Sequence, residues 1–231
     1  MVRDFPSPGA GSWESAARAW LADPAPGPQP RLAATVLLLR DGAAGPEVFV
    51  QRRVPTMEFA PSMHVFPGGG VDPADADVAL DPSALVALAA TMGASPEAAA
   101  PVLAAAVREV EEECGVRLDL ADLRVRANWV TPHFERRRYD TWIFAARLPQ
   151  GQEAVGSTTE ADHFRWVRPA DLLAEAVTGA ALLLPPTLVA LEELASFATV
   201  ASFLADTPVV SRVLPVLVDT GDGVVIRADL P

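Results

Sequence analysis

The stretch from Arg108 to Val116 constrains this chain more than any other segment. It reads Arg-Glu-Val-Glu-Glu-Glu-Cys-Gly-Val, and an apolar run follows it. Glu109 and Glu113 stand four residues apart, so on a helix they lie one turn apart, with Glu112 beside both. Gly115 is the residue type that most often ends a helix. The pattern predicts a helix that stops at Gly115 and gathers three carboxylates.

Two interpretations of this acidic turn are open: a solvated surface or a cation site. Like charges at helical spacing repel by a few tenths of a kcal/mol per pair, so a cation over them is favourable. Mg²⁺ takes oxygen ligands and combines one or two carboxylates with substrate phosphate oxygens. The upstream cluster Gly68-Gly69-Gly70 favours the cation site, because glycine lets the backbone approach a metal or phosphate closely. We therefore predict an Mg²⁺ or Mn²⁺ site formed by Glu109, Glu112, Glu113 and Gly69, with Gly68 beside it as a substrate contact.

Composition narrows the class of protein. The chain has 231 residues, of which 50% are apolar, enough for the core of one large domain. The net charge of −12 argues against a nucleic-acid partner, which normally meets a basic face. No apolar run approaches the length that spans a bilayer, and no signal-peptide pattern precedes Trp13, so we expect a cytoplasmic protein without a membrane partner. Cys114 is the single cysteine; without a nearby base it is expected to be a small buried side chain.

The order of predicted elements indicates an α+β fold with a mixed sheet. Strands are predicted at 31–39, 47–51, 123–130, 141–148 and 164–167, and a terminal hairpin within 209–228. Helices are predicted at 12–22, 82–92, from a restart near Ser95, at 170–177 and at 187–204. Because Pro101 cannot lie deep within a helix, we expect the glutamate helix to begin close to it. Val102, Ala106 and Val110 would then face inward, with Arg108 and the three glutamates on the other side.

The chain divides into three predicted parts. Residues 1–30, rich in Pro, Gly and Ala, are expected to form an N-terminal arm. Residues 31–206 would form the main domain, which contains an Ala- and Leu-rich helical segment at about 76–100. Residues 207–231 would form a C-terminal hairpin extension. The apolar helical segment or the hairpin could pack against a second copy of the chain, so a homodimer is one predicted assembly.

The acidic turn resembles a known family, the Nudix hydrolases. Their box reads Gly-x5-Glu-x7-Arg-Glu-U-x-Glu-Glu-x-Gly-U, where U is aliphatic, and Arg108 to Val116 matches its second half at every specified position. The resemblance implies an α/β/α sandwich in which a mixed sheet lies between helices. It also implies a metal-dependent pyrophosphohydrolase.

The first half of the box departs from this pattern. Five residues separate Gly69 from Asp75, which stands where the pattern has Glu, and residues 76–107 separate Asp75 from Arg108 where the pattern has seven residues. About 25 residues are therefore inserted within the box. Such an interruption resembles the family branch that hydrolyses CoA and acyl-CoA. The segments Gln51-Arg52-Arg53 and Phe59 to Gly69 are similar to the signature of that branch, although Ser62 stands where it has Gly.

The resemblance also assigns roles to individual residues. It implies that Arg108 orients the glutamates by charge pairing. It places the general base either within the box or on an acid in a loop before a Trp-containing strand. Glu160, ahead of Trp166, fits that position, and Asp162 is the alternative.

The arginine run at residues 136–138 is the second candidate site. Guanidinium groups bind phosphate in a fork geometry, and three consecutive arginines are unusual in an acidic chain. A basic hairpin tip is the other interpretation. We predict that Arg137 or Arg138 contacts substrate phosphate, with Arg52 and Arg53 as further contacts, and that His133 is a turn or core residue.

The predicted function is metal-dependent hydrolysis of a diphosphate linkage in a nucleoside-diphosphate-linked small molecule. CoA or acyl-CoA is the first hypothesis, from the resemblance. Nucleoside triphosphates, nucleotide sugars or NADH are alternative substrates. A regulator that binds nucleotides without turnover is the alternative of a different class.

Overall fold

The β2 strand, Arg31–Gly42, is the centre of this protein. The computed structural model describes residues 1–6, 12–57 and 59–231. β2 pairs in parallel with β7 (Tyr139–Arg147) and antiparallel with β3 (Gly45–Arg53) and β5 (Gly68–Gly70). Its apolar residues alternate between the two faces: Val36 and Leu38 face one core cluster, and Leu37 and Leu39 face the other. A strand buried on both faces needs helices on each side of its sheet.

The other strands are β1 Val2–Phe5, β3 Gly45–Arg53, β4 Met63–Val65, β5 Gly68–Gly70, β6 Arg124–Val130, β7 Tyr139–Arg147, β8 Ala161–Val167, β9 Leu182–Leu183, β10 Arg212–Val213, β11 Val216–Asp219 and β12 Val224–Asp229. The helices are α1 Ser12–Ala22, α2 Pro82–Met92, α3 Pro96–Cys114, α4 Pro169–Thr178, α5 Pro185–Ala195 and α6 Val200–Ala205, with the short 3₁₀ turns η1 Pro73–Asp77 and η2 Leu120–Asp122.

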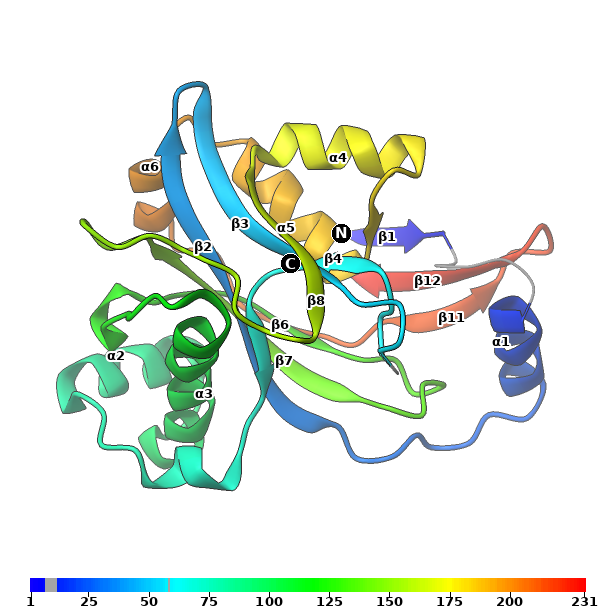
Figure 1. Cartoon of the computed structure of the whole chain (residues 1–231). Coiled ribbons are helices and arrows are strands. Elements are labelled where there is room, and N and C mark those ends of the chain that lie inside the picture. Colours follow the sequence, from blue (N-terminus) through cyan, green and yellow to red (C-terminus); the bar gives the residue numbers. More distant parts are fainter. Residues whose placement is uncertain (7–11, 58) are drawn as a thin grey trace.

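Within the described residues, the main sheet has nine strands in the order β10-β6-β7-β2-β3-β4-β9, with β5 on β2 and β8 on β3. Helices α2 and α3 cover one face, and α4, α5 and α6 cover the other (Figure 1). A second sheet has the order β1-β12-β11. The predicted α+β sandwich with a mixed sheet is confirmed.

Two helix predictions are wrong, one because the helix is interrupted and one because it begins earlier. The predicted helix over 187–204 is two helices, α5 and α6, and they separate because Thr199 caps α6 by accepting a hydrogen bond from the Ser202 N–H at 3.1 Å. Pro101 lies inside α3, which begins at Pro96 after the Ser95 cap. Its ring costs one main-chain hydrogen bond. The buried contacts of the flanking apolar residues Val102 and Leu103 offset that cost.

The N-terminal strand was not predicted. In β1, Phe5 pairs with Ile226 of β12, so the start of the chain completes the sheet of the terminal hairpin. Strands β4, β5, β9 and β10 have only two or three residues, too few to show alternation in a sequence. Of the predicted arm, residues 7–11 lie outside the described residues.

In the part of the chain that the structure describes, no single helix has the length and apolar character to cross a membrane. Among the described helices, only α2 and α3 taken together have both properties, and a bend of 103° separates them.

A buried guanidinium ties β6 to the helices on the α5 and α6 face. The Arg126 side chain is 1% exposed; it ion-pairs with Glu193, lies 3.1 Å from the Asp206 carboxylate and donates to the Phe203 carbonyl at 3.2 Å. Its Cζ lies 4.1 Å from the centroid of the Phe203 ring. A buried charge held from several sides destabilises the fold when the set is broken.

Replacing Arg126 should therefore destabilise the fold far more than replacing an exposed arginine. Arg126→Ala is expected to lower the free energy of unfolding by about 2–3 kcal/mol, because carbonyls and carboxylates lose a buried partner. Arg147, half exposed and paired with Asp41 at 2.8 Å, is the matched control, and Arg147→Ala should cost under about 1 kcal/mol. Urea unfolding measures both, and equal losses would contradict the assignment.

Candidate active site

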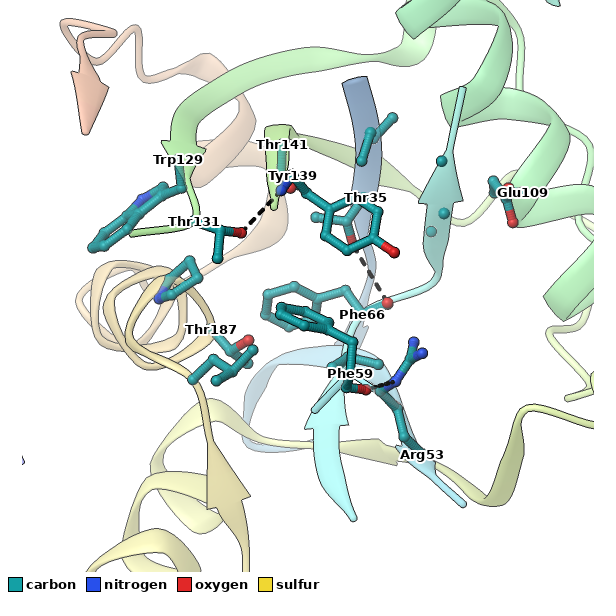
Figure 2. Close-up of a pocket in the computed structure, with 18 of the residues that line it drawn as sticks. Thr35, Arg53, Phe59, Phe66, Glu109, Trp129, Thr131, Tyr139, Thr141 and Thr187 are labelled. Atoms are coloured by element: carbon teal, nitrogen blue, oxygen red, sulfur yellow. Dashed lines mark hydrogen bonds between the residues drawn. The ribbon is translucent and has the colours of Figure 1, made fainter. Parts of the chain in front are cut away.

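A cavity of about 920 Å³ opens between the end of α3, the loop between β6 and β7, and the start of α5. One end is acidic and lies against β5; the other end is aromatic and apolar. Figure 2 shows Glu109 on one side of this space and Trp129 on the other. The acidic end is lined by Gly68–Gly70, Asp72, Arg108, Glu109, Glu112, Glu113 and Glu160. The apolar end is lined by Phe59, Phe66, Trp129, Phe134, Tyr139, Leu184, Pro185 and Ile226.

Arg108 is the centre of the acidic end. Its guanidinium meets both oxygens of Asp75, at 2.9 and 3.0 Å. It also lies 2.8 Å from the Glu109 carboxylate and 3.1 Å from that of Glu112, and it donates to the Gly70 carbonyl at 3.1 Å. One planar cation therefore joins the acidic turn of α3 to the glycine strand and to η1.

Asp75 was noted in the sequence only as a departure from the family pattern. The structure brings it under Arg108, because η1 carries it back toward α3. Asp75 is buried, and burial opposes its ionisation. Hydrogen bonds from Arg108 and from the Asp72 N–H outweigh burial, so the pKa of Asp75 lies below its usual value. The aspartate thus forms a two-point ion pair with Arg108 in spite of its short side chain.

Glu113 is buried, which corrects the expectation that it lies on the outer side of α3. Its Oε2 accepts from the Gly68 N–H and from Gln51 Nε2, each at 2.8 Å. Burial raises the pKa of Glu113 to about 7, against the effect of these two donors. Gln51 was not predicted as a site residue. The sequence feature that could have indicated it is a polar side chain at a buried position of an otherwise apolar strand.

The glycines of β5 leave room for the glutamates. A methyl group on Gly69 would overlap the Glu109 carboxylate, and one on Gly68, whose φ is +155°, would overlap the Ala34 carbonyl. Burial raises the pKa of Glu109, with Arg108 opposing the shift. A larger residue at Gly69 would displace the Glu109 carboxylate, and one at Gly68 would collide with the main chain of β2.

The chemistry of the acidic end suits a hard divalent cation. Its donors are carboxylate oxygens, the ligand type that Mg²⁺ and Mn²⁺ prefer. Burial raises the pKa of both Glu109 and Glu113; Arg108 opposes the shift at Glu109, and hydrogen bonds from Gly68 and Gln51 oppose it at Glu113. In the described residues, no three His, Cys, Asp or Glu side chains are already arranged to hold a metal. The donors therefore fit the ion in type, but they are not preassembled around it.

The four predicted arginines separate into two pairs. Arg53 and Arg137 line the cavity, and Arg53 lies 3.7 Å from the Glu160 carboxylate. Arg52, on the opposite face of β3, pairs with Asp162 at 2.8 Å. Arg138 is buried, and its guanidinium donates to main-chain carbonyls. The geometry therefore gives no support to a substrate contact by Arg52 or Arg138.

The other residues considered in the sequence, two acids, the cysteine and a histidine, differ in whether they reach the cavity. Glu160 lines the cavity, whereas Asp162 is held by Arg52, whose hydrogen bond keeps the pKa of Asp162 below its usual value. Cys114 is fully buried, and burial raises the pKa of its thiol to about 12, which is inconsistent with a nucleophile. His133 lies exposed in the loop before β7.

The buried carboxyl of Glu113 should make stability depend on pH in the absence of metal. The folded pKa of about 7 exceeds the ordinary value of 4.5, so the free energy of unfolding should fall as pH rises from about 4.5 through 7. The fall is at most about 3 kcal/mol, since one pKa unit corresponds to 1.36 kcal/mol.

Glu113→Gln should remove this contribution and be more stable than the wild type at pH 8, because its oxygen can still accept from Gly68. Glu111→Gln, which changes an exposed acid paired with Arg117, is the matched control. Urea unfolding at pH 5 and pH 8 with EDTA measures the effect. Equal pH slopes in the wild type and Glu113→Gln would refute it.

The chain is similar to known proteins over the segment that carries this site. The family model described as the NUDIX domain matches residues 83–185, which include the acidic turn. Comparison with curated proteins gives no match. A solved NUDIX hydrolase from Alicyclobacillus acidocaldarius has 24% sequence identity and a TM-score of 0.64, over 78% of this chain and 98% of that one.

Two further solved structures are similar at lower TM-scores. An Ap4A hydrolase binary complex from C. elegans has 17% identity and a TM-score of 0.46, over 76% of this chain and 98% of that one. The MutT protein from Methanosarcina mazei Go1 has 16% identity and a TM-score of 0.48, over 72% and 94%. The fold comparison rests on the Alicyclobacillus protein. The chain thus has the Nudix hydrolase fold and matches a NUDIX domain across its acidic turn, and these findings support a pyrophosphohydrolase.

Proposed function

We propose that this protein hydrolyses the diphosphate linkage of CoA or acyl-CoA with the help of Mg²⁺ or Mn²⁺. One observation carries the proposal: a single cavity joins an acidic, arginine-centred end to a long apolar end. Attack of water on one phosphorus would release phosphopantetheine, or its acylated form, and an adenosine bisphosphate.

The acidic end supplies what cleavage of a diphosphate requires. The linkage is protected by its own negative charge, so cations must lie against its oxygens and a water must be aimed at phosphorus. Glu109, Glu112 and Glu113 would hold the ion. When bound, it neutralises phosphate charge and makes a nearby water more acidic.

The chain's own groups would orient substrate and move the proton. Arg53 and Arg137 line the cavity and can pair with phosphate oxygens in the fork geometry of guanidinium. The Glu160 side chain is 58% exposed and faces the same space, so it can accept the proton of the attacking water. Arg108 holds the glutamates in position through its contacts with Asp75 and Glu109.

The size of the cavity and its apolar end favour a substrate with an apolar arm. At about 920 Å³ it lies near the upper end of the usual range for ligand sites. Six acids line it against three arginines, so a bound divalent cation would offset part of the negative charge; the acids are Asp72, Glu109, Glu112, Glu113, Glu135 and Glu160. Nucleoside triphosphates, nucleotide sugars and NADH are the alternative substrates.

A substrate screen tests the proposal. Purified protein with Mg²⁺ or Mn²⁺ is incubated with CoA, decanoyl-CoA, NADH, ADP-ribose and deoxynucleotides, and mass spectrometry identifies the products. Cleavage of the CoA compounds that EDTA abolishes is the expected result. Tight binding without turnover would favour the regulator hypothesis, and preference for another compound would refute the CoA assignment.

Glu112→Gln should abolish most of this activity without harming the fold. The loss is expected to exceed the roughly 10- to 100-fold caused by removing a residue that only supports a metal ligand. Thermal unfolding should be unchanged or slightly improved, because one charge of the acidic turn disappears. Glu111→Gln, one residue away and exposed, should keep wild-type activity. Full activity in Glu112→Gln would remove it from the ligand set.

Arg137→Ala should affect substrate binding more than the chemical step. If Arg137 holds phosphate alike in the ground and transition states, KM rises while kcat changes little. Arg136→Ala, at the exposed neighbouring position, is the control. Steady-state kinetics with the substrate found in the screen measures both values, and an unchanged KM would exclude Arg137 as a phosphate contact.

A further inference from the structure

The loop between β6 and β7, residues 131–138, is fastened by a buried arginine. Arg138 is 5% exposed, and its guanidinium donates to the Thr131 carbonyl at 3.0 Å and to the Pro28 carbonyl at 2.7 Å. Burial lowers the pKa of Arg138, yet a guanidinium keeps its charge in proteins. A buried charge is costly unless it is well hydrogen-bonded. Arg138 therefore ties the two ends of this loop to each other and to the segment before β2.

The segment before β2 touches the loop through its main chain as well. At Gly27, a methyl group would overlap the His133 carbonyl and lie 2.9 Å from Cδ of Arg138. The Arg31 N–H donates to the Arg138 carbonyl at 2.9 Å, where β2 begins its pairing with β7. We call Gly27, Pro28 and Arg138 the clamp.

A third contact comes from the first helix. The ring of Trp13 in α1 packs edge-on against Phe134, with centroids 5.3 Å apart. Figure 1 shows the chain running from α1 to β2 along the same side of the molecule as this loop. The N-terminal part of the chain is thus packed against the loop, not detached from it.

The clamped loop forms one wall of the cavity. Its side chains that line the space are Thr131, Pro132, Phe134, Glu135 and Arg137. The nearby Trp129 and Tyr139 belong to the ends of β6 and β7 and line the apolar end, as Figure 2 shows. The position of this wall decides how much room the apolar end offers.

We propose that Arg138 and Gly27 are positioning residues for substrate selection, because the clamp sets the wall against which a ligand's apolar arm packs. This inference rests on the proposed function for its ligand class, a nucleoside diphosphate that carries an apolar arm. A ligand without the arm, such as ADP, places its diphosphate at the acidic end and meets this wall only through Arg137, so it depends less on the clamp. Arg138 thus acts through the loop and not by touching phosphate.

Binding of two probes tests the clamp. Calorimetry with Ca²⁺ in place of Mg²⁺, which keeps a divalent cation on the carboxylate oxygens without the octahedral geometry of Mg²⁺, measures the affinity of the full-length protein for decanoyl-CoA and for ADP. Arg138→Ala should weaken decanoyl-CoA binding at least about tenfold more than ADP binding, the lower end of the effect of one methylene group in an apolar pocket. Gly27→Ala should act in the same direction. Arg138→Lys keeps the charge but has one nitrogen in place of the two that contact the carbonyls, so its effect should lie between those of the wild type and Arg138→Ala. Arg136→Ala should leave the ratio unchanged.

Hydrogen exchange supplies a readout that is independent of any ligand. In Arg138→Ala and Gly27→Ala, the amides of residues 131–139 should exchange faster than in the wild type, because the contacts that hold this loop in place are removed or displaced. If Arg138→Ala does not fold, Gly27→Ala and Arg138→Lys carry the same test.

The results separate the clamp from the proposed function. Equal weakening of both probes, an unchanged ratio, unchanged exchange, or a wild type that does not bind decanoyl-CoA would overturn the clamp. Hydrolysis of decanoyl-CoA by the wild type together with an unmoved ratio would refute the clamp and keep the function. A shifted ratio in a protein that hydrolyses no diphosphate would refute the function and keep the clamp.

Discussion

The pairing of Arg108 with Asp75 is the interaction on which the candidate site depends. Two parallel hydrogen bonds fix the plane of the guanidinium, whose remaining donors face Glu109, Glu112 and the Gly70 carbonyl. Without this ion pair, the carboxylates of the acidic turn would move apart into solvent, because like charges repel. One buried carboxylate thus organises several partly buried ones.

The fold makes this pairing possible because it brings together two residues that lie 33 positions apart in the chain. Between Asp75 and Arg108 the chain builds α2 and the first half of α3, and apolar packing of these helices on β2 returns Arg108 to its partner. The central sheet then carries the acidic end on the α3 side, while the β6–β7 loop and α5 bound the apolar end. A charged end and an apolar end in one cavity are what a diphosphate joined to an apolar arm would require.

Local sequence patterns predicted much of the fold because they report local physics. Gly115 ends α3, and the turn near Gly221 joins β11 to β12, as capping and hairpin preferences indicate. The break between α5 and α6 and the position of Pro101 were missed, since tertiary packing and a single cap overrode the average preference of those residues. Very short strands such as β4 and β5 exist only through their neighbours.

By itself, the sequence determined the acidic turn, its spacing on a helix and the glycines opposite it, because helical periodicity places neighbours without knowledge of the rest of the chain. Only the tertiary structure decided which groups face the cavity. It placed Arg53 in the lining and Arg52 outside it, and it buried Arg138 in a clamp and Glu113 against Gln51. The physical reason is that burial and partner choice depend on segments far apart in the chain, which one sequence window does not contain.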